Sequence, residues 1–396
     1  MRRQLSTCIS SSRNYDVVIV GGGVVGSSIA YHLAKLAPRR ILVIERDNTY
    51  RLASLSLSAG GIRQQFSLPE NIKMCIYGAE FVKAAKTELV VSGQEVPDLS
   101  FKENGYLFLA GDKASKDTLK ANHKVQLECG AVWMKLLDPV VLKKEFPWLN
   151  IDGLELGSFS LRNEGYFDPW SFVNAMKQKA ISLGVEYIEA EVIGAAMTRA
   201  MNSPLSVDYL RVASCARGNK VHSEGILHIK GEKFVNAAGA WAGKFVDMLI
   251  AHSPTSSSSA HTAITRLPVE RRKRCIFTVH CPGAVSSPVG EDPLCPPPNT
   301  PLVIDPSGVY FRPEGGRLLS SFSTHKLSYP PPAFDVHTGP GKFIVGVSPT
   351  EERDAPCTSD SELENVDEYL FDDVIWPTLS ERVPAFEQLK GVIGCL

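Results

Sequence analysis

The sequence predicts an α/β protein in which a Rossmann-like nucleotide-binding domain is interleaved with a second domain built on an antiparallel sheet. Three observations support this fold class. Residues 15–46 place a glycine-rich turn between an apolar run and a periodic apolar segment. Later segments alternate between strand-like and helix-like patterns, as α/β proteins do. The chain has 396 residues, which is long enough for two domains.

The glycine-rich turn follows the pattern G-x-G-x-x-G. Apolar residues 17–20 predict a strand, and three glycines follow it at the required spacing. Gly21 allows the sharp turn out of the strand, Gly23 lets backbone approach a pyrophosphate, and Gly26 lets helix and strand pack closely. The helix that begins here directs unpaired N–H groups and the positive end of its dipole at the phosphates.

An acidic residue stands where a dinucleotide site requires one. Residues 41–44 predict a second strand, and Glu45 follows it, nineteen positions after Gly26. A carboxylate there accepts hydrogen bonds from the hydroxyls of an adenosine ribose and disfavours a 2′-phosphate. Glycine-rich turns are common, so the motif alone is weak evidence. Strand, helix and acid together predict a dinucleotide site.

The composition argues against several classes of protein. A formal net charge of -1 gives no general attraction to nucleic acid. No uninterrupted apolar run approaches the roughly 18 residues that cross a bilayer, which leaves peripheral attachment to a membrane open. The nine cysteines form no C-x-x-C pair and the nine histidines are scattered. We therefore expect free thiols and no metal site.

The first segment, residues 1–13, contains three arginines, four serines and no acid. This composition is typical of a mitochondrial transit peptide, of which these residues would be a remnant. The alternative is an ordinary disordered N-terminal tail.

The remaining elements follow from local patterns. A loop of small residues at 54–61 lets backbone lie against a bound cofactor. Asp168 followed by Pro169 begins a helix, and Gly184 ends it. The other predicted elements are helices over 70–91 and 113–129, and strands over 104–110, 185–188, 191–193, 225–229 and 233–241.

These motifs together resemble the superfamily of FAD-dependent D-amino-acid oxidases, glycine oxidases and sarcosine and dimethylglycine dehydrogenases. Besides the dinucleotide motif, the resemblance is carried by GGIRQQF at 60–66, GYFDP at 165–169, GVEYIEAEV at 184–192 and VNAAGAWA at 235–242. LPVERRKRCIF at 267–277 and DPSGVYFRPEGG at 305–316 are similar to a mitochondrial branch associated with assembly of respiratory complex I. The resemblance covers nearly the whole chain.

The resemblance implies that the dinucleotide is FAD. It assigns these cofactor contacts: Gly21, Gly23, Gly26 and Glu45 on the ADP portion, Arg46 beside the ribose, Ser58, Gly60 and Gly61 along the pyrophosphate and flavin, Val192 at the adenine, and Ala238 with Gly239 near the dinucleotide. Relatives that hold FAD covalently have a histidine where Ser58 stands, so attachment by that route is not expected.

The implied reaction removes a hydride from a carbon next to an amine, and the implied substrate is a small amine or amino acid. We expect Arg63 to stabilise the reduced flavin. Tyr310 and Arg312, two positions apart on a predicted strand, would present a phenol and a guanidinium to a substrate carboxylate. The alternative is that these two side chains share a face of the strand for packing alone.

Three functions remain open. One is a flavin-dependent amine or amino-acid dehydrogenase of the mitochondrial matrix or the matrix face of the inner membrane. Another is a non-catalytic assembly factor with structural FAD that binds complex I assembly intermediates. The third follows from the end of the sequence, which lacks the family's last strand, glycine-rich segment and helix, and predicts a truncated form with impaired FAD retention.

The resemblance also implies the domain bounds. We expect residues 14–91 and 157–245 to form the FAD-binding domain and residues 92–156 and 246–373 the substrate domain. Residues 374–396 would return to the FAD-binding domain. The segment 317–341 is expected to be an inserted loop, because its three consecutive prolines cannot join a sheet.

Overall fold

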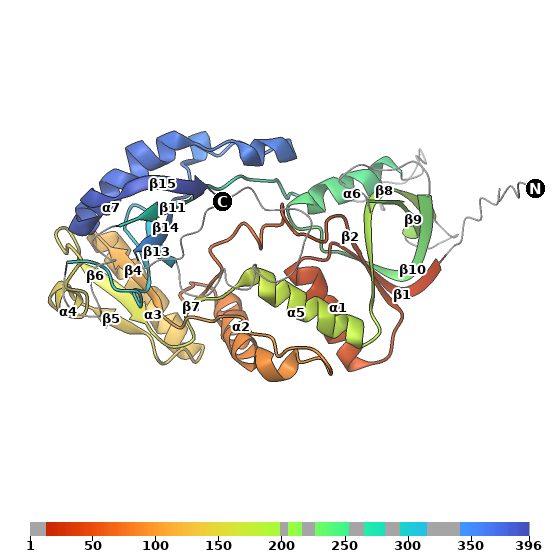
Figure 1. Cartoon of the computed structure of the whole chain (residues 1–396), viewed down its shortest axis with the longest axis horizontal. Coiled ribbons are helices and arrows are strands. Elements are labelled where there is room, and N and C mark those ends of the chain that lie inside the picture. Colours follow the sequence, from red (N-terminus) through yellow and green to blue (C-terminus); the bar gives the residue numbers. More distant parts are fainter. Residues whose placement is uncertain are drawn as a thin grey trace, which may run out of the picture. The chain divides into compact units, whose positions relative to one another are not determined.

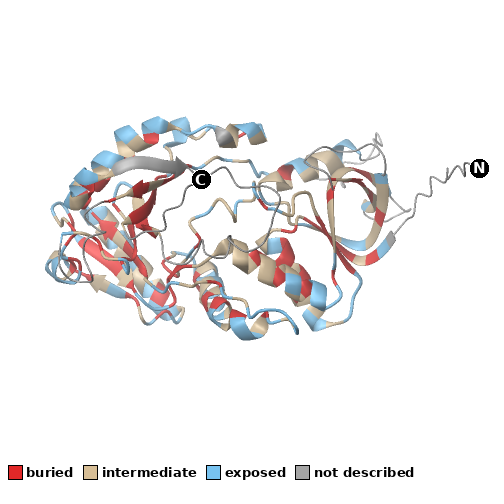
Figure 2. Cartoon of the chain, viewed as in Figure 1, coloured by how far each residue is buried: buried red, intermediate tan, exposed pale blue. Residues whose placement is uncertain are grey.

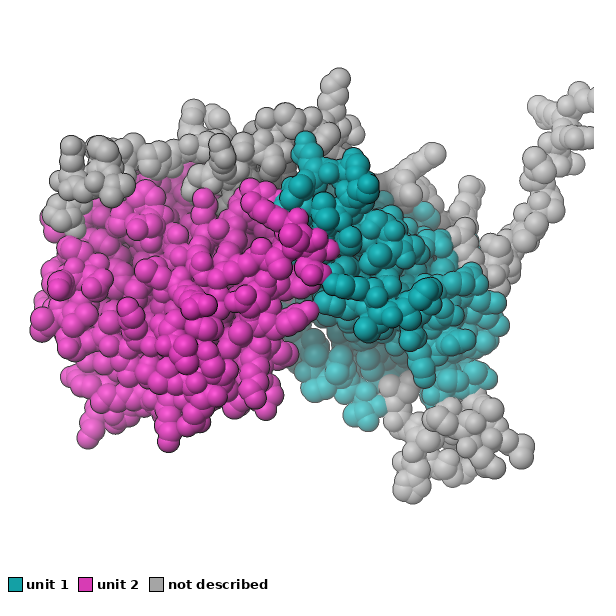
Figure 3. Space-filling view, turned by 90° about the horizontal axis from the view of Figure 1, so that it is seen from below, with its two compact units in different colours: residues 1–57, 89–97, 170–272 teal, residues 58–88, 98–169, 273–396 magenta. Residues whose placement is uncertain are grey.

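A computed structural model describes residues 13–198, 205–215, 226–252, 265–281, 294–314 and 341–395. Residues 1–12 and 317–340, which belong to the predicted leader and inserted loop, lie outside these ranges. The chain divides into two compact units, coloured in Figure 3. Unit 1 contains Met1–Leu57, Leu89–Pro97 and Trp170–Arg272, and unit 2 contains Ser58–Glu88, Asp98–Pro169 and Lys273–Leu396.

Unit 1 is built on a sheet whose first strands are parallel (Figure 1). β1 (Arg13–Val20) lies between β2 (Ile41–Glu45) and β10 (Ile226–Asn236), parallel to both. β8 (Glu186–Thr198) continues the sheet beyond β2, and β9 (Ser206–Ser214) pairs antiparallel with β8 and β10. The five strands therefore close into a ring in the order β1-β10-β9-β8-β2.

Two pairs of predicted short strands are each one long strand. β8 runs from Glu186 through both 185–188 and 191–193 without a break, and β10 runs from Ile226 into the first part of 233–241. The reason is that β8 changes partner without ending: its first residues pair with β2 and its later residues with β9. The register of the pairing between β8 and β9 shifts between Val192 and Gly194.

The described part of unit 1 also contains the α-helices α1 (Val24–Leu36), α5 (Pro169–Ser182) and α6 (Ala242–Ala251). The predicted end of α5 is confirmed, because Gly184 has φ +93°, a left-handed conformation that favours glycine after a helix. The core of unit 1 lies along the strands, where Figure 2 shows buried residues in red. It is apolar and includes Val18, Leu42, Leu210, Val212 and Ile229.

Unit 2 is built on an eight-stranded sheet in the order β15-β11-β14-β13-β12-β4-β6-β5. Its neighbouring strands are antiparallel except for β12 and β4, which run parallel. The strands are β4 (Tyr106–Ala110), β5 (Lys135–Leu137), β6 (Leu156–Ser160), β11 (Ile276–His280), β12 (Leu302–Ile304), β13 (Tyr310–Glu314), β14 (Lys342–Gly346) and β15 (Lys390–Cys395). A separate two-stranded sheet joins β3 (Gly61–Ile62) to β7 (Gly165–Tyr166).

The helices of unit 2 are α2 (Pro69–Glu88), α3 (Lys113–Glu128), α4 (Pro139–Glu145) and α7 (Trp376–Arg382). Helices α2 and α3 begin and end within a few residues of the helices predicted over 70–91 and 113–129, whereas α4 and α7 were not predicted. The sequence assigned the first of these to the FAD-binding domain, whereas α2 belongs to unit 2.

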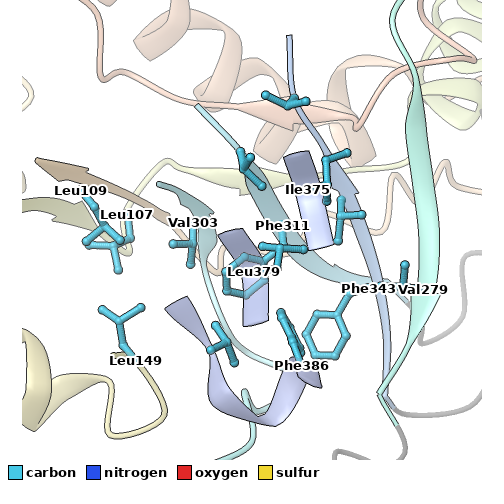
Figure 4. Packing of buried hydrophobic residues seen from close by; sticks show 14 of the residues in the cluster. Leu107, Leu109, Leu149, Val279, Val303, Phe311, Phe343, Ile375, Leu379 and Phe386 are labelled. Carbon is cyan, nitrogen blue, oxygen red and sulfur yellow. The ribbon is translucent and has the colours of Figure 1, made fainter. Parts of the chain in front are cut away.

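The C-terminal segment packs into unit 2, where the sequence predicted that residues 374–396 return to the FAD-binding domain. Phe386 packs edge-on against Phe311 and Phe343, with ring centroids 5.1 and 4.9 Å apart (Figure 4). Ile375 and Leu379 enter the same core, and β15 pairs with β11. Burial of these side chains holds the segment in unit 2, because removing apolar surface from water is the main favourable term in folding.

Among the residues that the structure describes, no helix is both long and apolar enough to cross a membrane. The same ranges contain no group of three or more His, Cys, Asp or Glu residues placed to hold a metal ion.

Candidate functional site

The turn between β1 and α1 admits only glycine at its first position. Gly21 has φ +101°, and a β-carbon there would overlap the carbonyl oxygen of Ala237. The Gly21 N–H donates to the Ile44 carbonyl at 2.9 Å, and the Ala237 N–H donates to the Val20 carbonyl at 2.8 Å. The ends of β1, β2 and β10 are therefore fixed to one another at this turn.

The other two glycines of the motif have opposite surroundings. A β-carbon at Gly26 would overlap the carbonyl oxygen of Gly21 and lie 3.0 Å from its carbonyl carbon. At Gly23, which precedes α1, a β-carbon would meet no atom within 4 Å. Gly23 is the N-cap residue of α1 and has no side chain that could accept from the first N–H groups of the helix. The first turn of α1 has no acidic residue either. The first N–H groups of α1 therefore point toward open space at the positive end of the helix dipole, which favours an anion.

Glu45 is held by two backbone donors. Its Oε2 accepts from the Gly22 N–H at 2.7 Å, and its Oε1 accepts from the Asp47 N–H at 2.9 Å. Burial raises the pKa of this carboxyl, and the two N–H donors act in the opposite direction. Each carboxylate oxygen keeps a further lone pair, so Glu45 can accept two hydroxyl groups from a ligand.

These groups open onto one pocket of about 690 Å³ in unit 1, within the size range of small-molecule sites. Seven of the predicted cofactor residues line it: Gly21, Gly23, Glu45, Arg46, Val192, Ala238 and Gly239. Gly26 lies beneath the turn, against Gly21. Beside the glycine turn, Asn236 fixes the loop after β10 by accepting from the Ala238 N–H at 3.3 Å and donating to the Ala242 carbonyl at 3.0 Å.

Cations gather at the wall of this pocket that Trp241 forms. The guanidinium of Arg46 lies 4.0 Å from the centre of the Trp241 ring, and that of Arg271 lies 5.7 Å from it. Lys244 also lines the pocket. Stacking fixes the two guanidinium groups where their charge favours an anionic ligand.

Two further residues of the pocket region, Tyr50 and Lys177, were not predicted from the sequence. Tyr50 lines the pocket, is 2% exposed and has φ +55°, which is rare for an aromatic residue. Its hydroxyl has no hydrogen-bond partner among the described residues. Behind it, the ammonium of Lys177 lies 5.6 Å from the Tyr50 ring and 5.4 Å from the Tyr187 ring, and donates to Asn48 Oδ1 at 2.6 Å. No local sequence signal marks a tyrosine in this conformation.

In unit 2, the predicted flavin loop is held in a fixed conformation. Gly60 has φ +62°, and a β-carbon there would overlap the Phe167 carbonyl oxygen. Its N–H donates to Ser58 Oγ at 3.2 Å. A β-carbon at Gly61 would overlap the Tyr106 hydroxyl. Glycine is thus required at both positions for close packing.

The guanidinium of Arg312 is committed to this loop. Its Nε and Nη2 donate to the Ala59 carbonyl at 3.2 and 2.9 Å, and its Nη1 donates to the Pro313 carbonyl and to Glu314 at 2.8 and 2.5 Å. The group also stacks on the Tyr166 ring at 3.9 Å. A substrate carboxylate would have to compete with these acceptors, which favours the packing alternative for Arg312.

Tyr310 lies two residues earlier on β13, opposite Gly346 of β14. A β-carbon at Gly346 would overlap the Tyr310 ring, so this glycine makes room for the phenol. Burial raises the pKa of the Tyr310 hydroxyl, which therefore stays protonated and can donate a hydrogen bond.

Arg63 lies in an aromatic cage in unit 2. Its guanidinium lies 4.7 Å from the Phe66 ring, 5.3 Å from Phe108 and 5.8 Å from Tyr106. Its Nε is buried and has no acceptor among the described residues. Arg63 therefore keeps a donor for a ligand, in addition to its charge.

The fully buried Glu164 lies near Arg63 and was not predicted from the sequence either. It accepts from the Gln64 N–H at 2.6 Å and from Gln65 Nε2 at 2.8 Å. Burial raises the pKa of Glu164 to about 7, although these donors and the charge of Arg63 lower it. Nothing in the segment around Glu164 shows from sequence that its side chain is buried.

A family model described as FAD dependent oxidoreductase matches residues 16–390 of this chain. The chain belongs to this family. Family members carrying the name FAD-dependent oxidoreductase domain-containing protein 1 are similar over most of the chain. The Xenopus laevis protein is 39% identical over 385 residues, which cover 95% of this chain and 68% of the relative. The Bos taurus protein is 37% identical over 385 residues, covering 95% and 70%.

Solved structures share the fold of this chain. L-proline dehydrogenase from P. horikoshii matches with a TM-score of 0.64 at 23% identity, over 96% of this chain and 79% of that one. Glycine oxidase from Geobacillus kaustophilus matches with a TM-score of 0.63 at 21% identity, over 96% and 81%. The structural matches confirm the fold class, and the family model and the relatives confirm the family that the sequence motifs predicted.

The pocket of unit 1 fits the ADP portion of the family cofactor, FAD. Open space at Gly23 and the N–H groups of α1 suit the pyrophosphate. The remaining lone pairs of Glu45 suit ribose hydroxyls. The buried hydroxyl of Tyr50 is a further polar atom that a ligand in the pocket can satisfy.

The buried carboxyl of Glu164 makes the stability of unit 2 depend on pH. Its folded pKa of about 7 is above the ordinary value of 4.5, so its protonated form stabilises the fold and that contribution is lost as pH rises from about 4.5 to 7. The loss is on the order of 3 kcal/mol. We expect Glu164→Gln, which cannot ionise, to gain stability relative to wild type as the pH rises. Urea unfolding at about pH 5 and about pH 8 measures this, and a pH-independent difference between the two proteins would contradict it.

Proposed function

We propose that this chain binds FAD through unit 1 and acts as an oxidoreductase on a carbon–nitrogen bond of a small amine or amino acid. The observation that carries the proposal is the convergence of the glycine turn, the N-terminus of α1 and Glu45 on one pocket. When bound, FAD supplies the hydride acceptor. The human relative named dimethylglycine dehydrogenase, mitochondrial, is 26% identical over 267 residues, covering 65% of this chain and 28% of the relative, and supports an amine substrate.

The residues of the chain have distinct parts in this proposal. The N–H groups of α1 hold the pyrophosphate, and Glu45 holds the ribose. In unit 2, Arg63 offers a charge and an unpaired donor that favour an anionic group. Tyr310 keeps a protonated hydroxyl, which can donate to a substrate carboxylate. Arg312 fixes the loop at 58–61, which the sequence predicts to contact the flavin, by donating to the Ala59 carbonyl.

We also propose a location in the mitochondrion, in the matrix or at the matrix face of the inner membrane. The arginine- and serine-rich leader supports this. Relatives named dimethylglycine dehydrogenase and sarcosine dehydrogenase are described as mitochondrial.

A second candidate is a non-catalytic assembly factor whose FAD is structural and whose partners are complex I assembly intermediates. The contacts of Arg312 favour this candidate, because the predicted substrate arginine already donates four hydrogen bonds to three acceptor atoms within unit 2. On this view FAD stabilises the fold by mass action, as any ligand of the native state does.

One experiment separates the candidates. The visible spectrum of the purified chain is recorded before and after denaturation to give the ratio of FAD to protein, and sarcosine, dimethylglycine and proline are then added without oxygen. Bleaching of a stoichiometric flavin by any of them supports the enzyme. A flavin that none of them bleaches, together with FAD-dependent capture of complex I subunits, supports the assembly factor. A chain that neither contains nor takes up FAD overturns both proposals.

A further inference from the structure

We propose that Tyr50 is a ribose-recognition residue, whose phenol donates a hydrogen bond to a hydroxyl oxygen of the adenosine that Glu45 also binds. This inference rests on the proposed function, since it requires a dinucleotide in the pocket of unit 1. It adds a donor to a site in which the sequence motif supplies only an acceptor.

The backbone places Tyr50 beside Glu45. The Asp47 N–H donates to Glu45 Oε1 at 2.9 Å, and the Tyr50 N–H donates to the Asp47 carbonyl at 3.0 Å, which closes a turn after β2. Asp47 also accepts from the Thr49 N–H at 2.9 Å. The Glu45 carboxylate is thus part of the structure that sets the position of Tyr50.

The conformation of Tyr50 is costly by itself. A left-handed backbone at φ +55° is strained for an aromatic residue, and such strain persists only where the surroundings impose it. The Ala53 N–H donates to the Tyr50 carbonyl at 3.0 Å, which fixes the residue on its other side. The strained turn directs a bulky side chain back to the pocket that Glu45 also lines.

The hydroxyl of Tyr50 lacks a partner where one is expected. The side chain is 2% exposed and lines the pocket, and no described residue accepts from or donates to its oxygen. Buried hydroxyl groups in folded proteins nearly always have a hydrogen-bond partner. Burial and the nearby charge of Glu45 raise the pKa of the phenol, so it keeps its proton and remains a donor.

Lys177 fixes the position of the Tyr50 ring through a cation–π contact. Its ammonium lies over the Tyr50 and Tyr187 rings and donates to Asn48 Oδ1, all within unit 1. The cation therefore attracts the face of the Tyr50 ring and leaves its hydroxyl free to bond elsewhere. Lys177 is a positioning residue in this arrangement.

The two side chains are chemically complementary toward a hydroxyl group. An ionised carboxylate only accepts, so Glu45 takes the proton of a ribose hydroxyl, while the oxygen of that hydroxyl still has lone pairs for a donor. The phenol of Tyr50 supplies that donor. The pair therefore distinguishes a ribose from a deoxyribose more strongly than the carboxylate alone.

The test compares wild type with Tyr50→Phe by calorimetric titration with ADP, 2′-deoxy-ADP and 3′-deoxy-ADP. We expect the variant to bind ADP about tenfold more weakly, the usual effect of losing one buried hydrogen bond. We expect wild type and variant to bind one of the two deoxy analogues equally, which identifies the hydroxyl. Without nucleotide, we expect the variant to melt at the same or a higher temperature, because an unsatisfied buried hydroxyl has been removed.

Tyr187→Phe is the matched control. Tyr187 faces the same lysine, but its hydroxyl already donates to Ser27 Oγ at 3.3 Å and it does not line the pocket. Loss of the Tyr187 hydroxyl should lower the melting temperature of the nucleotide-free protein and leave its affinity for ADP unchanged. Equal affinity of Tyr50→Phe and wild type for ADP, or an equal loss with all three ligands, overturns the inference. A wild-type chain that binds none of the three contradicts the nucleotide site itself, which is a separate result.

Discussion

Replacing Gly26 with alanine is expected to abolish FAD binding and to lower the free energy of unfolding by about 1–3 kcal/mol, the usual cost of overpacking. The added methyl group would overlap the carbonyl oxygen of Gly21 and lie 3.3 Å from Ile19 Cγ2. The obstructing oxygen belongs to backbone that is itself held by the bond from Gly21 to Ile44. Helix α1 must therefore move away from β1, and the turn that we propose binds the pyrophosphate moves with it.

Gly23→Ala is the matched control, because it adds the same methyl group three positions away. Gly23 has φ −63°, which alanine adopts without strain, and its β-carbon would meet no atom of the protein. Stability should be unchanged or slightly higher, while FAD affinity falls because the methyl group occupies space in front of the helix. Equilibrium unfolding and FAD titration of both variants measure the two effects. Equal stability of Gly26→Ala and wild type would contradict this account of the turn.

Replacing Arg382 with alanine is expected to destabilise unit 2 by about 3–5 kcal/mol, the usual cost of leaving one charge of a buried pair unpaired. Arg382 Nε donates to Asp305 Oδ2 at 2.8 Å, and both side chains are about nine-tenths buried. Its Nη1 also donates to the carbonyls of Asn150 and Asp152, at 2.7 and 3.2 Å. The substitution leaves the Asp305 charge and two carbonyl groups without these donors. Urea unfolding followed by far-UV circular dichroism measures the loss.

Two further variants test the cause. Lys124→Ala removes the exposed pair between Lys124 and Glu128, whose side chains are 80% and 63% exposed, and should cost no more than about 0.5 kcal/mol. The double variant Arg382→Met with Asp305→Leu removes both buried charges and should recover much of the stability. A double variant as unstable as Arg382→Ala would show that the carbonyl contacts, and not the unpaired charge, determine the loss.

The parts of the fold that follow from local backbone chemistry were predictable. The glycine turn, the strands beside it and the end of α5 at Gly184 depend on residues adjacent in sequence. The continuous strands β8 and β10 were not predictable, because each changes partner at a point that only the assembled sheet defines. The position of the C-terminal segment depends on contacts such as Phe386 with Phe311, which are far apart in sequence.

The candidate site divides in the same way. The pocket residues that belong to the dinucleotide motif could be predicted from the sequence, because the spacing of the glycines and of the acidic residue is characteristic of a dinucleotide site. Tyr50 and Glu164 could not, because their importance comes from burial and from missing or distant partners. Arg312 was readable as a bidentate donor, but its acceptor, the carbonyl of Ala59, was visible only in the folded unit.

The link between Arg312 and Ala59 also bears on the order of events during synthesis. These two residues are separated by 253 positions, and the hydrogen bond between Gln64 and Glu164 joins residues 100 positions apart. Contacts at such separations form late, because closing a long loop costs entropy before any contact offsets it. The loop predicted to carry the flavin therefore acquires its final shape only after most of the chain has left the ribosome.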